Sequence, residues 1–220
     1  MTVIPRLSGP SHPPASDAAP RKLVILLHGV GADGQDLIGL APPLSGVLPD
    51  AEFLAPDGPE PCDMAPFGRQ WFSLQDRTPS RMLAGIQATA PILDAFIDEA
   101  LAERGLTDAD LALVGFSQGT MMSLHVAPRR TRACAGVLGF SGALLGPELL
   151  PAEARSKPPV MLIHGDADQV VPFGALGAAR AALDGAGFAV EAEARPGLGH
   201  GIDPEGLTAG ARFLVQCLAG

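Results

Sequence analysis

The chain has 220 residues, 47% of them hydrophobic and 18% charged, a balance that allows a buried core and excludes wholesale disorder. This length suits one domain and is short for two. The 24 acidic and 15 basic residues give a formal charge of -9. Nucleic acid and anionic membrane surfaces are therefore not expected partners.

The first twenty residues are predicted to be a flexible lead-in, because residues 9–20 combine Pro, Ser and Gly with few bulky apolar side chains. They show no signal-peptide pattern, and no apolar run reaches the roughly 20 residues of a membrane span. The three cysteines are widely spaced, which predicts reduced thiols and neither a disulfide framework nor a metal site. We expect a cytoplasmic protein, without stable membrane insertion.

From residue 21 to residue 220 the sequence predicts one domain in which strands and helices alternate. Helical spacing separates short apolar runs that are typical of strands buried on both faces. The strands are expected at 23–27, 111–116, 136–140 and 160–163, with a weaker candidate at 53–55. The helices are expected at 36–47, 81–104, 118–127, 173–186 and 204–218. Crossover helices require parallel strands, so the pattern predicts a three-layer α/β fold with its ligand crevice at the carboxyl ends of the strands.

A candidate nucleophile, Ser117, lies between a predicted strand and a predicted helix. The sequence Gly115-Phe116-Ser117-Gln118-Gly119 is G-x-S-x-G in the strand-turn-helix setting that a nucleophile elbow requires. The glycines remove Cβ atoms that would collide with the neighbouring strand and helix. Ser141 also follows a strand, but it lacks the downstream glycine, so we interpret it as structural.

A serine nucleophile needs a general base, and histidine suits that role. Of the five histidines, His200 is the best candidate, because it lies in a glycine-rich loop after the last strand-like segment. His28 and His164 end strands, where they suit hydrogen bonding as well as catalysis, whereas His12 and His125 have no obvious route to the crevice. The segment after 160–163 offers two carboxylates for orienting the base, Asp166 and Asp168.

Four motifs together resemble the phospholipase/carboxylesterase family of α/β-hydrolases, which includes the acyl-protein thioesterases. They are His28–Gly34, Gly115–Gly119, His164–Asp168 and Gly199-His200, and the resemblance spans residues 23–218. It favours Asp168 over Asp166 and gives the order Ser, Asp, His that is typical of this fold. It implies a catalytic triad of Ser117, Asp168 and His200.

The resemblance also implies an α/β-hydrolase fold without a separate lid domain and without a cofactor or metal. The backbone N–H groups of Val30 and Gln118 would form the oxyanion hole. Residues 56–79 are predicted to form an excursion loop, in which residues 69–74 are either a short extra strand or an apolar patch over the crevice. The side chains of Trp71, Phe72 and Leu74 would then either line an acyl site or belong to the core.

The implied activity is hydrolysis of carboxylic esters through an acyl-enzyme on Ser117. Thioesters or lysophospholipids are alternative substrates, and a monomer or homodimer is expected. A dienelactone-hydrolase-like or peptidase activity shares the fold, although the former uses cysteine at the elbow. A non-catalytic binding module is the alternative from another class, and the complete triad argues against it.

Overall fold

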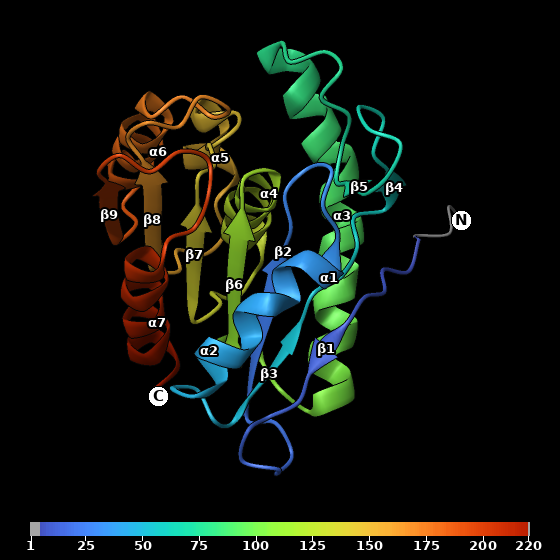
Figure 1. Cartoon of the computed structure of the whole chain (residues 1–220). Helices are drawn as coiled ribbons and strands as arrows, with labels where there is room; N and C mark the ends of the chain where they lie inside the picture. Colours follow the sequence, from blue (N-terminus) through green and yellow to red (C-terminus); the bar gives the residue numbers. More distant parts are fainter. Residues whose placement is uncertain (1–4, 220) are drawn as a thin grey trace.

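The structure, a computed structural model, describes residues 5–219. At its centre is a seven-stranded sheet in the order β1-β3-β2-β6-β7-β8-β9. The strands are β1 (Ser11–His12), β2 (Lys22–Leu27), β3 (Ala51–Leu54), β6 (Leu111–Phe116), β7 (Gly136–Phe140), β8 (Val160–Gly165) and β9 (Val190–Arg195). Neighbouring strands are parallel except β1, which runs antiparallel to β3. The carboxyl ends of β6, β7 and β8 therefore meet at one edge of the sheet (Figure 1).

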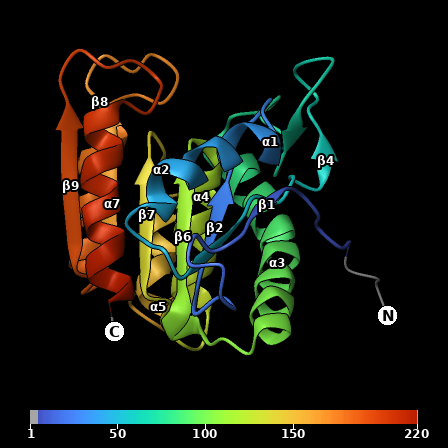
Figure 2. The ribbon, with the colours of Figure 1, turned by 60° about the horizontal axis from the view of Figure 1, so that its bottom comes forward.

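Helices cover both faces of this sheet, as predicted. They are α1 (Gly34–Leu37), α2 (Ala41–Ser45), α3 (Pro79–Arg104), α4 (Gln118–Val126), α5 (Leu150–Glu153), α6 (Gly174–Gly185) and α7 (Pro204–Leu218). Three short 3₁₀ turns adjoin helices: η1 (Ile38–Leu40), η3 (Ala127–Arg129) and η4 (Pro147–Leu149). A fourth, η2 (Asp108–Asp110), leads into β6. In Figure 2, α2 and α7 lie on the near face of the sheet.

Two hydrophobic cores result, because successive residues of a strand point to opposite faces. On β2, Val24 and Leu26 pack with apolar residues of α1, α2 and α7. The alternate residues Leu23, Ile25 and Leu27 pack with those of α3, α4 and α6. The central strands are buried on both faces, which explains why their sequences are continuous apolar runs.

The predicted elements are confirmed most closely in the middle of the chain. Strands β6 and β7 have the predicted bounds, and α7 begins and ends where expected. Strand β9 was not predicted, because its sequence Val190–Arg195 alternates alanine with charged residues and lies at the edge of the sheet. The excursion loop contains a small hairpin, formed by β4 (Glu60–Pro61) and β5 (Arg69–Gln70).

The prediction of a flexible lead-in is wrong for the residues around β1. Ser11 and His12 pair with Leu54 and Phe53 of β3. The carbonyl of Pro10 also accepts a hydrogen bond from the N–H of Ala55, at 3.0 Å. Composition missed this contact because two residues held by backbone hydrogen bonds need no apolar pattern of their own. Residues 1–4 of the expected lead-in lie outside the described residues, as does residue 220 of the expected domain.

Within residues 5–219, no helix combines the length and the apolar character that crossing a membrane requires.

His125 is a buried histidine on α4, 3% exposed, and its Nδ1 atom has no hydrogen-bond partner among residues 5–219. Burial, and secondly the charge of Arg129, lower its pKa from 6.5 to about 4. The unfolded chain therefore takes up this proton at higher pH than the folded protein does. The fold loses stability as the pH falls from 6.5 towards 4.

We predict that His125→Phe weakens the dependence of stability on acid. Between pH 7 and pH 5 the free energy of unfolding of the wild type should fall by about 2 kcal/mol because of this residue. The variant should lack this part of the fall. Urea unfolding at the two pH values measures the difference. His12→Phe, at a half-buried position of β1, is the control and should leave the wild-type dependence unchanged. An unchanged pH dependence in His125→Phe would contradict the prediction.

Candidate active site

Ser117 is the residue that joins β6 to α4, and its backbone has an unusual conformation. It has φ 53° and ψ -114°, a combination that costs on the order of 1–3 kcal/mol for a non-glycine residue. The Ser117 N–H donates to the carbonyl of Phe140 on the neighbouring strand, at 2.9 Å, which fixes the turn to the sheet. The surrounding structure therefore holds this serine in a strained position at the carboxyl edge.

Two glycines allow this turn because there is no room for side chains beside it. A Cβ atom on Gly119 would lie 1.8 Å from the carbonyl oxygen of Leu27. A Cβ atom on Gly115 would lie 2.4 Å from the backbone nitrogen of Thr120. Both neighbours are backbone, which cannot move aside as the end of a flexible side chain can. The two glycines of the G-x-S-x-G string are therefore needed for packing.

His200 and Asp168 meet at the same edge of the sheet. The Nδ1 atom of His200 lies 2.7 Å from Oδ2 of Asp168. The His200 ring packs 4.8 Å, between ring centroids, from Phe116, the residue before Ser117. The Ser117 hydroxyl makes no hydrogen bond to another residue among residues 5–219. The structure thus places the pair of His200 and Asp168 beside Phe116, the residue before Ser117.

The environment of Asp168 favours its charged form and fixes the imidazole. Burial alone would raise the pKa of Asp168, but hydrogen bonds from His200 and from the backbone N–H groups of Val170 and Val171 hold it below the ordinary value. A carboxylate facing Nδ1 requires the proton on that nitrogen, which leaves Nε2 free to accept another. His164 contacts the same carboxylate oxygen, at 3.3 Å.

Asp166, the competing carboxylate, has a different partner. Its Oδ1 atom accepts a hydrogen bond from the backbone N–H of Gly197, at 2.7 Å. This bond joins the loop after β8 to the loop that carries His200. Asp166 therefore braces the loop, whereas Asp168 is the carboxylate that bonds the imidazole of His200.

The loop that carries His200 is fixed at both ends by an ion pair. Arg195, the last residue of β9, donates from Nε and Nη2 to Oδ2 of Asp203, at 3.0 and 2.9 Å. Oδ1 of Asp203 accepts from the N–H of Gly206 and so caps the start of α7. The intervening residues 196–202 must close a short span, which limits where the imidazole can lie.

The predicted oxyanion donors also lie at this edge. The N–H of Val30 has no partner among residues 5–219, and the N–H of Gln118 occupies the first turn of α4, where a helix offers no internal acceptor. His28 supports the Val30 loop. Its Nε2 accepts from the N–H of Gly58, at 2.8 Å, so its Nδ1 carries the proton that is donated to the carbonyl of Gly29, at 2.7 Å. Burial lowers the pKa of His28, which favours this neutral form.

The side chain of Gln118 has a structural role that the sequence did not indicate. Its Oε1 accepts from the N–H of Trp71, at 2.9 Å, and its Nε2 donates to the carbonyl of Phe72, at 2.7 Å. The indole N–H of Trp71 donates to the carbonyl of His28, at 3.0 Å. These bonds tie the excursion loop to the nucleophile turn and to the oxyanion loop.

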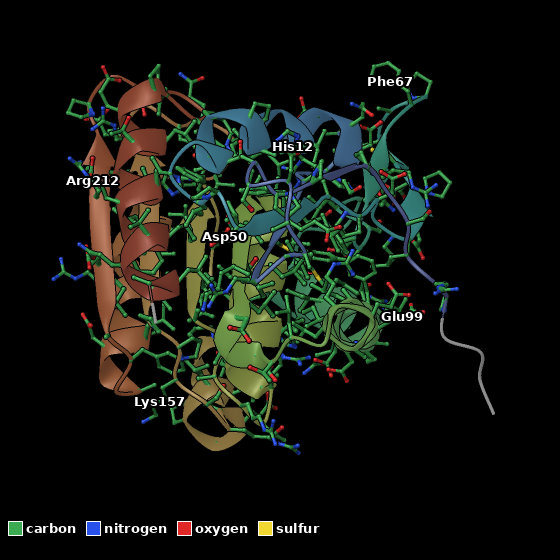
Figure 3. All side chains as sticks on the ribbon, turned by 90° about the horizontal axis from the view of Figure 1, so that it is seen from below. His12, Asp50, Phe67, Glu99, Lys157 and Arg212 are labelled. Atoms are coloured by element: carbon green, nitrogen blue, oxygen red, sulfur yellow. The ribbon has the colours of Figure 1, made fainter. Side chains whose placement is uncertain are left out.

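The expected acyl-site residues lie in the hydrophobic core. Trp71 is 0% exposed, Phe72 2% and Leu74 8%, and all three belong to the core beneath α3 and α4. The expectation that they line a substrate crevice is corrected for Trp71, which has no surface to offer a ligand. The reason is that the loop folds inward, where its backbone groups meet Gln118. The exposed aromatic of this segment is Phe67, at the outer end of the hairpin (Figure 3).

Among the described residues, no cluster of three or more His, Cys, Asp or Glu side chains is arranged to hold a metal ion.

Comparison with known proteins gives the same architecture. The crystal structure of esterase PE8 matches with a TM-score of 0.93 and 42% identity, over 97% of this chain and 100% of that one. Arabidopsis thaliana SOBER1 matches with a TM-score of 0.77 and 25% identity, over 90% and 99%. Esterase YpfH of Escherichia coli (strain K12) is 32% identical over 187 residues, which are 85% of this chain and 79% of that protein.

A mostly parallel sheet with a serine at a strained strand-to-helix turn, followed in the chain by an aspartate and a histidine, defines an α/β-hydrolase. The model of one family in this class, Phospholipase/Carboxylesterase, matches residues 14–218. The chain belongs to that family, and it is a carboxylic ester hydrolase.

We predict that Gly119→Ala disrupts the fold and the site together, because the added methyl group cannot fit against Leu27. The free energy of unfolding should fall by more than about 3 kcal/mol, as expected for a clash in a packed interior. Chemical denaturation measures this loss. The matched control is Gly177→Ala in α6, where a Cβ atom meets nothing within 4 Å. That variant should gain up to about 1 kcal/mol. Equal stability of the two variants would refute the proposed packing constraint.

Proposed function

We propose that the protein cleaves carboxylic esters through an acyl-enzyme on Ser117, with His200 as general base and Asp168 as the residue that orients it. The observation that carries this proposal is the 2.7 Å hydrogen bond between Asp168 and the Nδ1 atom of His200, on an imidazole that packs beside the residue preceding Ser117. This bond leaves Nε2 as the atom that accepts the serine proton.

The reaction follows from these groups in two halves. Ser117 Oγ attacks the ester carbonyl carbon while its proton passes to Nε2 of His200, and the carbonyl oxygen becomes an oxyanion. The N–H groups of Val30 and Gln118 donate to that oxyanion. The carbon–oxygen bond to the leaving alcohol then breaks, and the alcohol takes the proton from His200. Water, deprotonated by His200, attacks the acyl-enzyme in the same way and releases the acid and free Ser117.

Exposed apolar side chains on the outer loops support a substrate with an apolar acyl group. Met64 and Phe67 are 51% and 74% exposed in the hairpin loop, which packs against the oxyanion loop at Gly68 and Gly31. Val170, 53% exposed, follows Asp168. We place the acyl group on a shallow surface near these residues. Small esters are the primary proposal, with thioesters or lysophospholipids as alternatives.

We also propose a domain organisation, a cellular location and a class of partners for the protein. We propose one hydrolase domain over residues 21–220, acting in the cytoplasm as a monomer or homodimer on small-molecule or acyl ester substrates, without nucleic acid as a partner. The negative net charge and the three free cysteines support this setting.

We predict that a fluorophosphonate probe adds covalently to the wild type and not to Ser117→Ala, as intact-mass analysis would show. Asp168→Asn should slow the labelling at least 100-fold, because an amide no longer favours the correct imidazole tautomer. Asp166→Asn is the matched control, since an amide oxygen still accepts from Gly197, and its rate should stay within about threefold of wild type. An adduct that persists in Ser117→Ala would overturn the proposal, and equal loss in both aspartate variants would remove the special role of Asp168.

A panel of p-nitrophenyl esters of increasing chain length, run beside a palmitoyl-thioester peptide, tests the substrate class. A shallow acyl surface predicts highest kcat/KM at two to four carbons, because longer chains gain no further enclosed contact. An optimum at eight carbons or more, or preference for the thioester, would favour the alternative substrates.

A further inference from the structure

Ser141, directly after β7, has two features that are unfavourable for the stability of the fold. Its backbone is left-handed, with φ 48°, although it is not a glycine. Its hydroxyl is buried and has no hydrogen-bond partner among residues 5–219. Both features destabilise a protein, and their coincidence at one residue is typical of functional sites.

Apart from Ser117, the buried hydroxyl groups around the start of α4 have hydrogen-bond partners, and that of Ser141 does not. Thr120, on the adjacent helix, has an equally buried hydroxyl that lies 2.8 Å from the carbonyls of both Gly115 and Phe140. Ser123, one turn further along α4, donates to the carbonyl of Gly119 at 3.0 Å. The packing around α4 thus satisfies the hydroxyl groups of Thr120 and Ser123 and leaves that of Ser141, like that of Ser117, without a partner among residues 5–219.

Ser141 occupies the same level of the sheet as the nucleophile. Phe116 and Phe140 are register partners on β6 and β7, so the next residues, Ser117 and Ser141, are neighbours on strands about 4.8 Å apart. Their backbones are held alike: the Ser117 N–H donates to Phe140 and the Ser141 N–H to Ile163, both at 2.9 Å.

The imidazole of His200 contacts groups that belong to the two strands on either side of β7. At one side its Nδ1 atom bonds Asp168, which follows β8. At the other side its ring packs on Phe116, at the end of β6. Strand β7 lies between β6 and β8, and Ser141 is the first residue after it. Ser141 therefore follows the strand that lies between the two contacts of the imidazole, and we infer that its hydroxyl lies beside the ring.

We propose that Ser141 is a positioning residue whose hydroxyl oxygen stabilises the protonated form of His200. This inference rests on the proposed function. The imidazole carries a positive charge only after it takes the proton of Ser117, and the free lone pairs of a nearby hydroxyl then face an electron-poor ring edge. Among residues 5–219, Asp168 is the charged group in contact with His200, and His164 contacts the same carboxylate oxygen. Ser141 would add an uncharged acceptor on a second side.

Ser141→Ala separates this role from a structural one. The variant should be as stable as the wild type or more stable, because it removes an unpaired buried hydroxyl. Its kcat towards p-nitrophenyl acetate should fall about 10-fold with KM within twofold, since the interaction exists only when His200 is charged. The acid limb of its kcat/KM profile should move to lower pH. The matched control Ser123→Ala, also buried, should keep the wild-type kcat and profile.

Ser141→Gly provides a second variant, which relieves the backbone conformation as well. It should have the higher melting temperature of the two variants and the same loss of kcat. Wild-type kcat and pH profile in both variants would overturn the proposal, and so would losses of kcat that merely follow losses of stability. Fluorophosphonate labelling of the wild type distinguishes failure of the proposed function from failure of the proposed role of Ser141. Absence of labelling defeats the proposed function itself, whereas normal labelling with unchanged Ser141 variants defeats only the role of Ser141.

Discussion

The close approach of α4 to β2 at Gly119 is the constraint on which the rest of the site depends. Because Gly119 lies against the carbonyl of Leu27, the helix can begin immediately after β6, and Ser117 is forced into its strained turn. The same approach brings the N–H of Gln118 to the edge where the Val30 loop lies. The Gln118 side chain then reaches the backbone of Trp71 and Phe72. One short contact between helix and strand thus positions the proposed nucleophile, one proposed oxyanion donor and the excursion loop.

The remaining groups of the site come from distant parts of the chain, and each is fixed by a second partner. The tautomer of His28 is set by Gly58 on one side and Gly29 on the other. Asp168 is held by two backbone N–H groups besides His200. The loop of His200 is closed by the pair of Arg195 and Asp203. In the proposed reaction, such pre-organised groups would act without rearranging, which is the main source of electrostatic catalysis.

The sequence predicts the buried centre of the fold well because burial on both faces leaves a continuous apolar pattern, as in β6 and β7. It predicts the edges poorly. Strand β9 alternates alanine and charge, and β1 has only two residues, so neither carries enough apolar pattern. Within the site, Ser117 and His200 follow from local motifs, whereas choosing between Asp166 and Asp168 required a family resemblance. Which carboxylate faces the imidazole depends on tertiary contacts. The same limit applies to Trp71, whose inward orientation depends on hydrogen bonds to residues more than 40 positions away.

The two-residue strand β1 covers one edge of the central sheet. An uncovered β3 would present its backbone N–H and C=O groups as a template for a strand of another chain. Ser11 and His12 cover that edge, and Pro10, Pro13 and Pro14, which flank them, cannot donate to a further strand. A segment whose composition predicts a flexible lead-in therefore forms the edge strand of the sheet. Removing residues 5–12 would expose the backbone groups of β3 and would also take Leu7 out of the hydrophobic core.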